Sequence, residues 1–171
     1  NGFVRVEVKR YYLEIHSTKE INEIKQLPSG LKILKIDPPD FKLNKFFYKN
    51  IGKKHRWIDR LVWTDNQWIN FVEDKKVDTF TLKKANDIAG YFELIYHNDC
   101  NEIEIAYLGL LEEYLNKKLG SFLLHSALKK SFLKNPKRVW VHTCSLDHKN
   151  ALNNYLSRGM KVFKEETLFM N

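Results

Sequence analysis

The chain has 171 residues, of which 43% are hydrophobic and 13% aromatic, and 29 Lys and Arg against 21 Asp and Glu give a formal net charge of +8. This length predicts one domain over residues 1–171, because domains usually have about 100–200 residues. The two cysteines, Cys100 and Cys144, are too few for a disulfide framework. No apolar run approaches the roughly 20 residues of a membrane span, and no signal-peptide pattern opens the chain. These features argue against membrane, fibrous and disulfide-rich secreted proteins, and we expect a cytoplasmic protein with no membrane partner.

The excess of basic over acidic residues has two possible explanations. It favours anionic partners such as phosphates, nucleic acid or a phosphorylated cofactor. It also suits a lysine-rich, well-solvated surface, and charge alone does not separate the two.

The N-terminal half predicts strands and helices with clear ends. Alternating apolar residues predict a strand over residues 4–15 with a bulge near Arg10, and a shorter strand covers residues 31–36. Asp40 is placed to cap a helix that runs from Phe41 to about residue 50. Thr64 and Gln67 have the spacing of a capping box for a second helix.

The C-terminal half is richer in regular elements. Three neighbouring strands are predicted at 77–82, 88–96 and 103–111, followed by a helix over about 117–133 and a strand over 138–144. Asp147 is expected to cap a helix that ends at Gly159, and a last strand begins at 161–163. The three consecutive strands suit antiparallel pairing, whereas the later strand-helix-strand segments need crossover connections. This order predicts a mixed α/β (α+β) sheet with helices on its faces.

The connection between the third of these strands and the long helix is a candidate phosphate site. A helix start offers unpaired backbone N–H groups and the positive end of the helix dipole. Gly120 would let a ligand approach closely, and Lys117 and Lys118 would add positive charge. An ordinary strand-helix connection with a solvated lysine pair has the same sequence features.

Two motifs in residues 77–165 give this region a recognisable pattern. The first is residues 115–120, which align with the pattern Arg/Gln-x-x-Gly-x-Gly/Ala with Leu115 at its first position, Lys118 at its first glycine and Gly120 at its last position. The second is Ala151-Leu152-Asn153-Asn154-Tyr155, followed by Gly159-Met160. In motifs and order of elements, this half of the chain resembles the GNAT superfamily of acetyl-CoA-dependent N-acyltransferases. His148 stands where that family usually has Asn, and Met160 where it has Phe.

The resemblance implies a fold and a cofactor site. It implies a mostly antiparallel central sheet with a splayed V between its two central strands, residues 77–165 as the acetyl-CoA-binding core, and residues 1–76 as an N-terminal strand and acceptor-side helices. Acetyl-CoA would lie in the V, with its pyrophosphate at the backbone of the loop and helix start and its pantetheine amides along the splayed strand. The implied cofactor-binding residues are Leu108, Leu110, Leu115, Asn116, Lys117, Lys118, Leu119, Gly120, Ser121 and His148.

Acyl transfer to an amine needs a base for the amine proton and a proton donor for the leaving thiolate. The family motif implies Tyr155 as the donor, although a tyrosine on an apolar helix stripe also suits a core. Glu93 is the leading candidate for the base, because a carboxylate inside an apolar strand is costly unless it is paired or lines a cleft. Glu102 and Glu104 are its rivals, and each could simply face water at a strand edge.

Other residue clusters suggest an acceptor site. The segment Arg56–Trp63 combines aromatic rings with opposite charges, which suits an amine-bearing acceptor or a packing loop with a surface ion pair. The candidate acceptor residues are Trp57, Asp59, Arg60, Trp63 and His142. His142, Cys144 and His148 match no strong zinc spacing, so no metal is predicted.

We therefore expect an acetyl-CoA-dependent N-acetyltransferase that acts by direct transfer on an amine of a small molecule, peptide or protein. A GNAT-fold module that binds CoA or another ligand without catalysis is the first alternative. A basic RNA-binding protein is the second and less favoured one, because the chain lacks a recognised RNA-binding motif. A homodimer is compatible with either GNAT reading.

Overall fold

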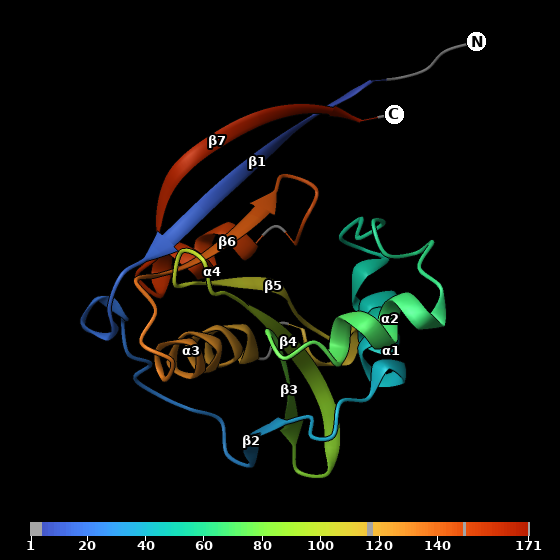
Figure 1. The fold of residues 1–171 in the computed structure, drawn as a ribbon. Coiled ribbons are helices and arrows are strands. Elements are labelled where there is room, and N and C mark those ends of the chain that lie inside the picture. Colours follow the sequence, from blue (N-terminus) through green and yellow to red (C-terminus); the bar gives the residue numbers. More distant parts are fainter. Residues whose placement is uncertain (1–4, 116–117, 149, 171) are drawn as a thin grey trace.

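A computed structural model describes residues 5–115, 118–148 and 150–170 (Figure 1). Its strands form one seven-stranded sheet in the order β2-β3-β4-β5-β6-β1-β7. The strands are β1 (Val6–Ile15), β2 (Leu31–Lys35), β3 (Val77–Lys84), β4 (Asp87–His97), β5 (Glu102–Leu110), β6 (Arg138–Cys144) and β7 (Lys161–Met170). The helices are α1 (Phe41–Gly52), α2 (Asp65–Val72), α3 (Leu119–Phe132) and α4 (Ala151–Ser157).

The sheet is divided by one parallel pairing. Neighbouring strands are antiparallel within the group β2-β3-β4-β5 and within the group β6-β1-β7. The two groups are joined by the parallel pairing of β5 with β6. The β5–β6 pairing covers only residues 102–104 against 138–140, after which the two strands diverge. The register of β5 against β4 also shifts, which leaves Ala106 as a bulge. The predicted mixed sheet with a splayed V between two central strands is therefore confirmed.

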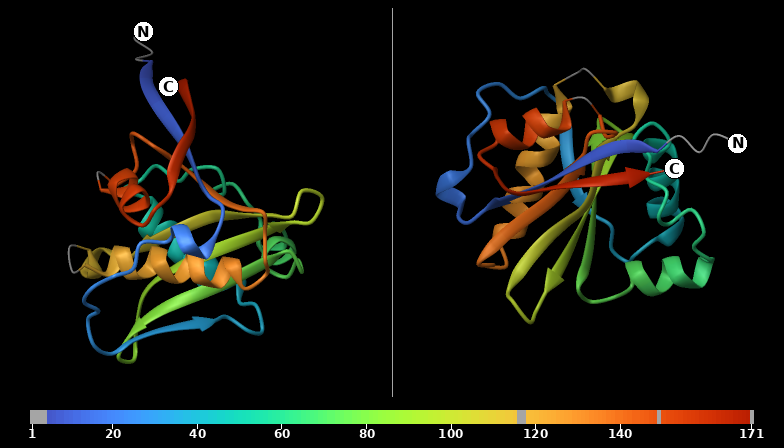
Figure 2. Two further views of the ribbon diagram at one scale, coloured as in Figure 1. Left: turned by 90° about the vertical axis from the view of Figure 1, so that its left-hand side faces the viewer. Right: turned by 90° about the horizontal axis from the view of Figure 1, so that it is seen from above.

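Helices cover both faces of the sheet, as predicted (Figure 2). α3 packs against β4, β5 and β6 and contacts α4, and its buried Leu119, Leu123 and Leu124 belong to the larger hydrophobic core. α1 lies on the opposite face, where Phe47 stacks on Tyr91 of β4 with ring centroids 4.7 Å apart. No helix in the described ranges is long and apolar enough to cross a membrane.

One feature of the sheet was not predicted, and two predicted details need correction. The N-terminal strand β1 lies between β6 and β7, although these two strands are close in sequence. Its irregularity against β7 falls between Tyr12 and Leu13, two residues beyond the expected bulge. α4 begins after Asn150 and is not capped by Asp147, because that carboxylate accepts hydrogen bonds within the preceding turn and from β6. The capping box of Thr64 and Gln67 at the start of α2 is confirmed.

A buried ion pair fixes the segment between α1 and α2 over the sheet. The Glu93 side chain is 0% exposed, and its Oε1 lies 2.8 Å from Nη1 of Arg60, whose side chain is 7% exposed. The Asn44 amide of α1 donates to Glu93 Oε2 at 2.8 Å and to Thr79 Oγ1 at 2.9 Å. The Arg60 backbone N–H donates to the Tyr48 hydroxyl at 2.9 Å. These contacts tie residues 53–64 to both α1 and β4.

Aromatic rings enclose the charged group of Arg60. Its Cζ lies 4.2 Å from the ring centroid of Phe71, 4.5 Å from that of Tyr107 and 4.7 Å from that of Trp63. The rings exclude water and offer their negative faces to the guanidinium. Because both charges are desolvated, each depends on its partner.

This pair predicts a large effect of single substitutions. Arg60→Met should lower the free energy of unfolding by about 3–5 kcal/mol, since it leaves Glu93 buried without its cation. Arg60→Met combined with Glu93→Leu should recover most of that loss, because a buried pair replaced by apolar groups costs little. Urea denaturation measures the free energy of unfolding of both proteins. The exposed substitution Arg56→Met is the control and should change this free energy by about 0.5 kcal/mol or less. Wild-type stability in the Arg60→Met protein would contradict this account.

Candidate functional site

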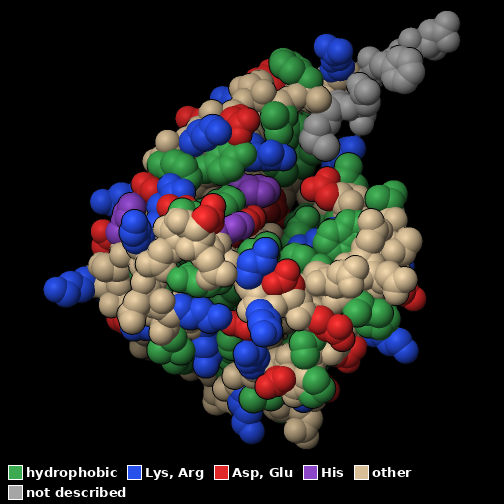
Figure 3. Space-filling model, in the orientation of Figure 1, with side chains coloured by type: hydrophobic (Ala, Val, Ile, Leu, Met, Phe, Trp, Pro, Cys, Tyr) green, Lys and Arg blue, Asp and Glu red, His purple; other side chains and the backbone are tan. Residues whose placement is uncertain are grey.

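The divergence of β5 and β6 opens a cleft that contains two adjoining cavities. The first measures about 330 Å³ and lies between β5, the start of α3, and α4. The second measures about 100 Å³ and lies between β5, β6 and the segment that follows α1. His55, Leu108, Asp147 and Tyr155 line both cavities. Figure 3 shows the hollow on this face, with histidine side chains beside it.

The start of α3 forms one end of the first cavity. Lys118 precedes the helix with φ 63° and ψ 17°, the left-handed conformation that glycine adopts most easily, and its side chain does not cap the helix. Asp40 and Thr64 cap α1 and α2. The first N–H groups of a helix have no partner within it, and here they adjoin a cavity that Leu115, Lys118, Gly120 and Ser121 line. This arrangement suits an anionic ligand.

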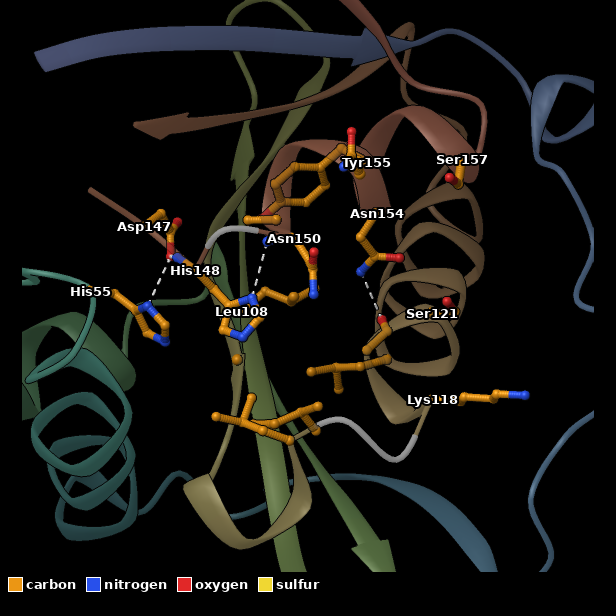
Figure 4. A pocket seen from close by; sticks show the side chains of 17 residues that line it. His55, Leu108, Lys118, Ser121, Asp147, His148, Asn150, Asn154, Tyr155 and Ser157 are labelled. Atoms are coloured by element: carbon orange, nitrogen blue, oxygen red, sulfur yellow. Dashed lines mark hydrogen bonds and ion pairs between the residues drawn. The ribbon is translucent and has the colours of Figure 1, made fainter. Parts of the chain in front are cut away.

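Gly120 leaves space for a ligand beside the helix. A Cβ at this position would have Asn154 Nδ2 as its nearest neighbour, at 3.6 Å, which is ordinary van der Waals contact. The same Asn154 amide donates to the Gly120 carbonyl at 3.0 Å and ties α4 to α3 (Figure 4). Packing within the protein therefore does not require glycine here.

The edge of β5 that faces the cleft is free of strand pairing. The Leu111 N–H donates to the Ala89 carbonyl of β4 at 2.8 Å. Backbone groups alternate in direction along a strand, so the N–H and C=O of Leu108 and Leu110 point the other way. The β5–β6 pairing ends at Glu104 and Trp140, so these groups face the open side of the V. They can pair with a ligand that carries amides.

An acid and a histidine meet where the two cavities join. His55, from the turn after α1, places its Nδ1 3.4 Å from Oδ1 of Asp147, which follows β6 (Figure 4). Asp147 is held by the Thr143 hydroxyl at 2.9 Å and by the His148 N–H at 2.8 Å. His55 Nδ1 makes no hydrogen bond to the described residues, but the nearby charge of Asp147 favours the tautomer with its proton on Nδ1, which leaves the lone pair of Nε2 available.

The environment of His55 keeps its ring neutral. The residue is 8% exposed, and burial is the main reason why its pKa lies below the ordinary value. The nearby charge of Asp147 raises that pKa, whereas His148 and Lys54 lower it. A neutral imidazole of this kind can accept a proton near neutral pH.

Tyr155 brings a hydroxyl to the same junction. The residue is 5% exposed and lines both cavities, and its hydroxyl has no hydrogen-bond partner among the described residues. Burial first, and Asp147 second, raise its pKa well above the ordinary value for tyrosine. The group therefore stays protonated and can donate. Figure 4 shows its ring extending from α4.

The structure brings most of the candidate residues to the two cavities. The first is lined by Leu108, Leu110, Leu115, Lys118, Gly120, Ser121, His148 and Tyr155. The second is lined by Trp57, Asp59 and His142, together with Leu108 and Tyr155. Leu119 is 0% exposed in the core, so only its backbone faces the helix start. Asn116 and Lys117 lie outside the described residues.

Three other candidates lie away from the cavities. Glu93, Arg60 and Trp63 form the buried ion pair and its aromatic cover, and none of them lines either cavity. The carboxylate of Glu93 is held by Arg60 and Asn44, so it is not free to take a proton from a ligand. The interpretation of Glu93 as a base and of Arg60 and Trp63 as acceptor residues does not fit this geometry.

Two residues at the centre of the site were not expected from the sequence in this role. His55 lies in a charged turn with no motif around it, and Asp147 has the spacing of a helix cap. Their proximity depends on how residues 53–64 fold over β5, which no local pattern specifies. Within the described ranges, no three His, Cys, Asp or Glu side chains are grouped so that they could hold a metal ion.

Comparisons with known proteins agree on one family. The family model described as "Acetyltransferase (GNAT) family" matches residues 35–160. A GCN5-related N-acetyltransferase from Sphaerobacter thermophilus superposes with a TM-score of 0.71 at 14% identity, over 98% of this chain and 52% of that one. A spermidine N-acetyltransferase from Vibrio cholerae has a TM-score of 0.60 and 18% sequence identity, and the match covers 77% of this chain and 80% of that one. For an aminoglycoside acetyltransferase from an uncultured soil metagenomic sample, the TM-score is 0.63 and the identity 14%, over 78% of this chain and 90% of that one.

These structural similarities concern the fold. The chain spans 52% to 62% of the length of several of these structures, among them a protein of unknown function from Staphylococcus epidermidis. A search among curated protein sequences gave no significant match.

The acid-histidine pair predicts a titration that NMR can follow. His55 should titrate below the ordinary histidine value of about 6.5, and Asp147→Asn should lower its pKa further, because the carboxylate stabilises the charged ring. A histidine whose pKa is lower in the folded than in the unfolded protein destabilises the fold at low pH. This loss of stability begins as the pH falls below the histidine's pKa in the unfolded chain, because the unfolded chain then binds more protons than the folded one. An unchanged His55 titration in the Asp147→Asn protein would show that the two groups do not interact.

Proposed function

Because the chain belongs to the acetyltransferase (GNAT) family, we propose that it transfers an acetyl group from acetyl-CoA to an amine. The observation that carries this proposal is the cleft where β5 and β6 diverge, which joins a helix start, an open strand edge and two proton-transfer groups. Each of these features has a matching part in the two substrates.

The described residues offer groups that complement the phosphates and the pantetheine amides of acetyl-CoA. The N–H groups at the start of α3 and the Lys118 cation suit its phosphates, and the space beside Gly120 admits them. The backbone of Leu108 and Leu110 suits the pantetheine amides. Lys118 stands where the family pattern has glycine, and it adopts the left-handed conformation that glycine adopts most easily.

The cosubstrate supplies a thioester, and the protein supplies the proton transfers. A C–N bond forms between the amine and the acetyl carbon as the C–S bond breaks, and the thiolate leaves with the bonding electrons. His55 Nε2 accepts a proton from the amine, and Asp147 stabilises the charge that the ring then carries. The Tyr155 hydroxyl donates a proton to the sulfur.

Gly120 tests the cofactor site. Gly120→Glu places a larger side chain and a negative charge beside the helix start, whereas alanine is compatible with the family pattern at this position. The variant should weaken acetyl-CoA binding about tenfold or more, because the new carboxylate crowds and repels the phosphates. Calorimetric titration measures the affinity, and Lys129→Ala at the far end of α3, which changes the net charge by the same amount, is the control that should leave it unchanged. Wild-type affinity in a folded Gly120→Glu protein would remove this helix start from the cofactor site.

Tyr155 tests the chemical step. Tyr155→Phe removes a hydroxyl without a protein partner, so the free energy of unfolding should change by less than about 1 kcal/mol. Turnover should fall about 100-fold or more through loss of the acid, with acetyl-CoA affinity close to wild type. Tyr96→Phe, which removes a hydroxyl bonded to Asn101 away from the cleft, is the matched control. Full turnover in the Tyr155→Phe protein would exclude this role.

A further inference from the structure

Arg10 brings an unpaired cation to the second cavity. It lies on β1 directly opposite Cys144 of β6, and both residues line this cavity. Among the described residues, its guanidinium makes no ion pair, and its Nε is buried without a hydrogen-bond partner. Its cross-strand neighbour Glu166 pairs with Lys164 at 3.6 Å, and the charge of Arg10 makes only the smallest contribution to the lowered pKa of Glu166, after Tyr12 and Lys164. A half-buried guanidinium without a partner is a ready site for an anion.

The other charges around this cavity favour the same kind of ligand. Arg56 lies on its wall from the turn after α1, and in the described part of the chain it also has no acidic partner. Of the two carboxylates that line the cavity, Asp147 is engaged by Thr143, His148 and His55. Asp59 is exposed and remains available for an ammonium group. Among the described residues that line this cavity, the charged groups are thus two guanidinium groups and two carboxylates, and the carboxylate of Asp147 is already hydrogen-bonded within the protein.

This balance suits a ligand with charges of both signs. Spermidine or an aminoglycoside has no anionic group for Arg10 and Arg56, and any of its positive charges placed near these two residues would be repelled. An amine that also carries an anionic group can place the anion against Arg10 and leave its amine near His55 and Asp59.

Resting on the proposed acetyl transfer, we propose that the acceptor is a small amine that also carries a carboxylate or a phosphate, and that Arg10 binds this anionic group. The assignment separates this chain from the structural neighbours whose names specify spermidine or aminoglycosides. It makes Arg10 a specificity-determining residue of the acceptor site, supplied by the N-terminal strand.

The test uses pairs of amines that differ only in the anionic group. L-lysine is compared with cadaverine, L-phenylalanine with phenethylamine, and O-phosphoethanolamine with ethanolamine, each as an acceptor for acetyl-CoA and as a ligand for the CoA-saturated protein. The anionic member of at least one pair should be preferred about 10- to 100-fold in kcat/KM or in affinity, as a charge-assisted hydrogen bond allows. The carboxylate and phosphate pairs show which anion is bound. Equal or better use of the amines that lack the anionic group, of spermidine or of an aminoglycoside would overturn the proposal.

Variants of Arg10 complete the experiment. Arg10→Gln should lower kcat/KM for the anionic member about 10- to 100-fold more than for the amine that lacks the anion, which abolishes the preference, and Arg10→Lys should restore part of it. Lys9→Gln removes the same charge from the neighbouring residue, which does not line the cavity, and should keep the preference intact. A preference that survives in Arg10→Gln overturns the proposal. Acetyl-CoA binding is measured in the same proteins, so loss of the cofactor site would be recognised separately.

Discussion

The short parallel pairing between β5 and β6 is the constraint on which the site depends. Three residue pairs join the strands, and an ion-pair network holds this closed end: Arg138 bonds Glu102 of β5 and Glu14 of β1 at 3.0 Å each. Beyond it the strands separate, and the resulting cleft is lined by α3 and α4 on one side and by residues of the segment after α1 on the other. An open strand edge inside a sheet leaves backbone groups that need partners, and a ligand with amides can provide them.

The buried pair of Glu93 and Arg60 determines what stands opposite this open edge. By tying the segment after α1 to β4, it places His55, Trp57 and Asp59 beside residues of β6 and the turn after it. The charge of Glu93 is thus engaged in holding the fold, and in the proposed mechanism His55 and Tyr155 transfer the protons. The same segment also brings Arg56 to the cavity that Arg10 lines from β1.

The parts of this arrangement that are local in sequence could be predicted from it. The ends of β3, β4, β5 and β6 predicted from the pattern of apolar residues lie within two residues of the observed ends. The capping box at Thr64 correctly predicted the start of α2. The resemblance that rests on the motifs at 115–120 and 151–155 led to eight of the seventeen described residues that line the first cavity. The insertion of β1 between β6 and β7 could not be predicted, because strand order depends on contacts far apart in the sequence. The role of Glu93 was missed for the same reason. Its place in an apolar strand suggested a catalytic base, but its ion-pair partner Arg60 is 33 residues away in the sequence.

Backbone amide exchange with and without CoA tests the central claim most directly, since that claim is that the ligand occupies the divergence of β5 and β6. Saturating CoA should slow exchange at the N–H groups of Leu108 and Leu110 and at residues 119–121, and it should leave β2 and β3 unchanged. Unaltered exchange at β5 and at the start of α3 in the CoA-saturated protein would contradict this account of the site.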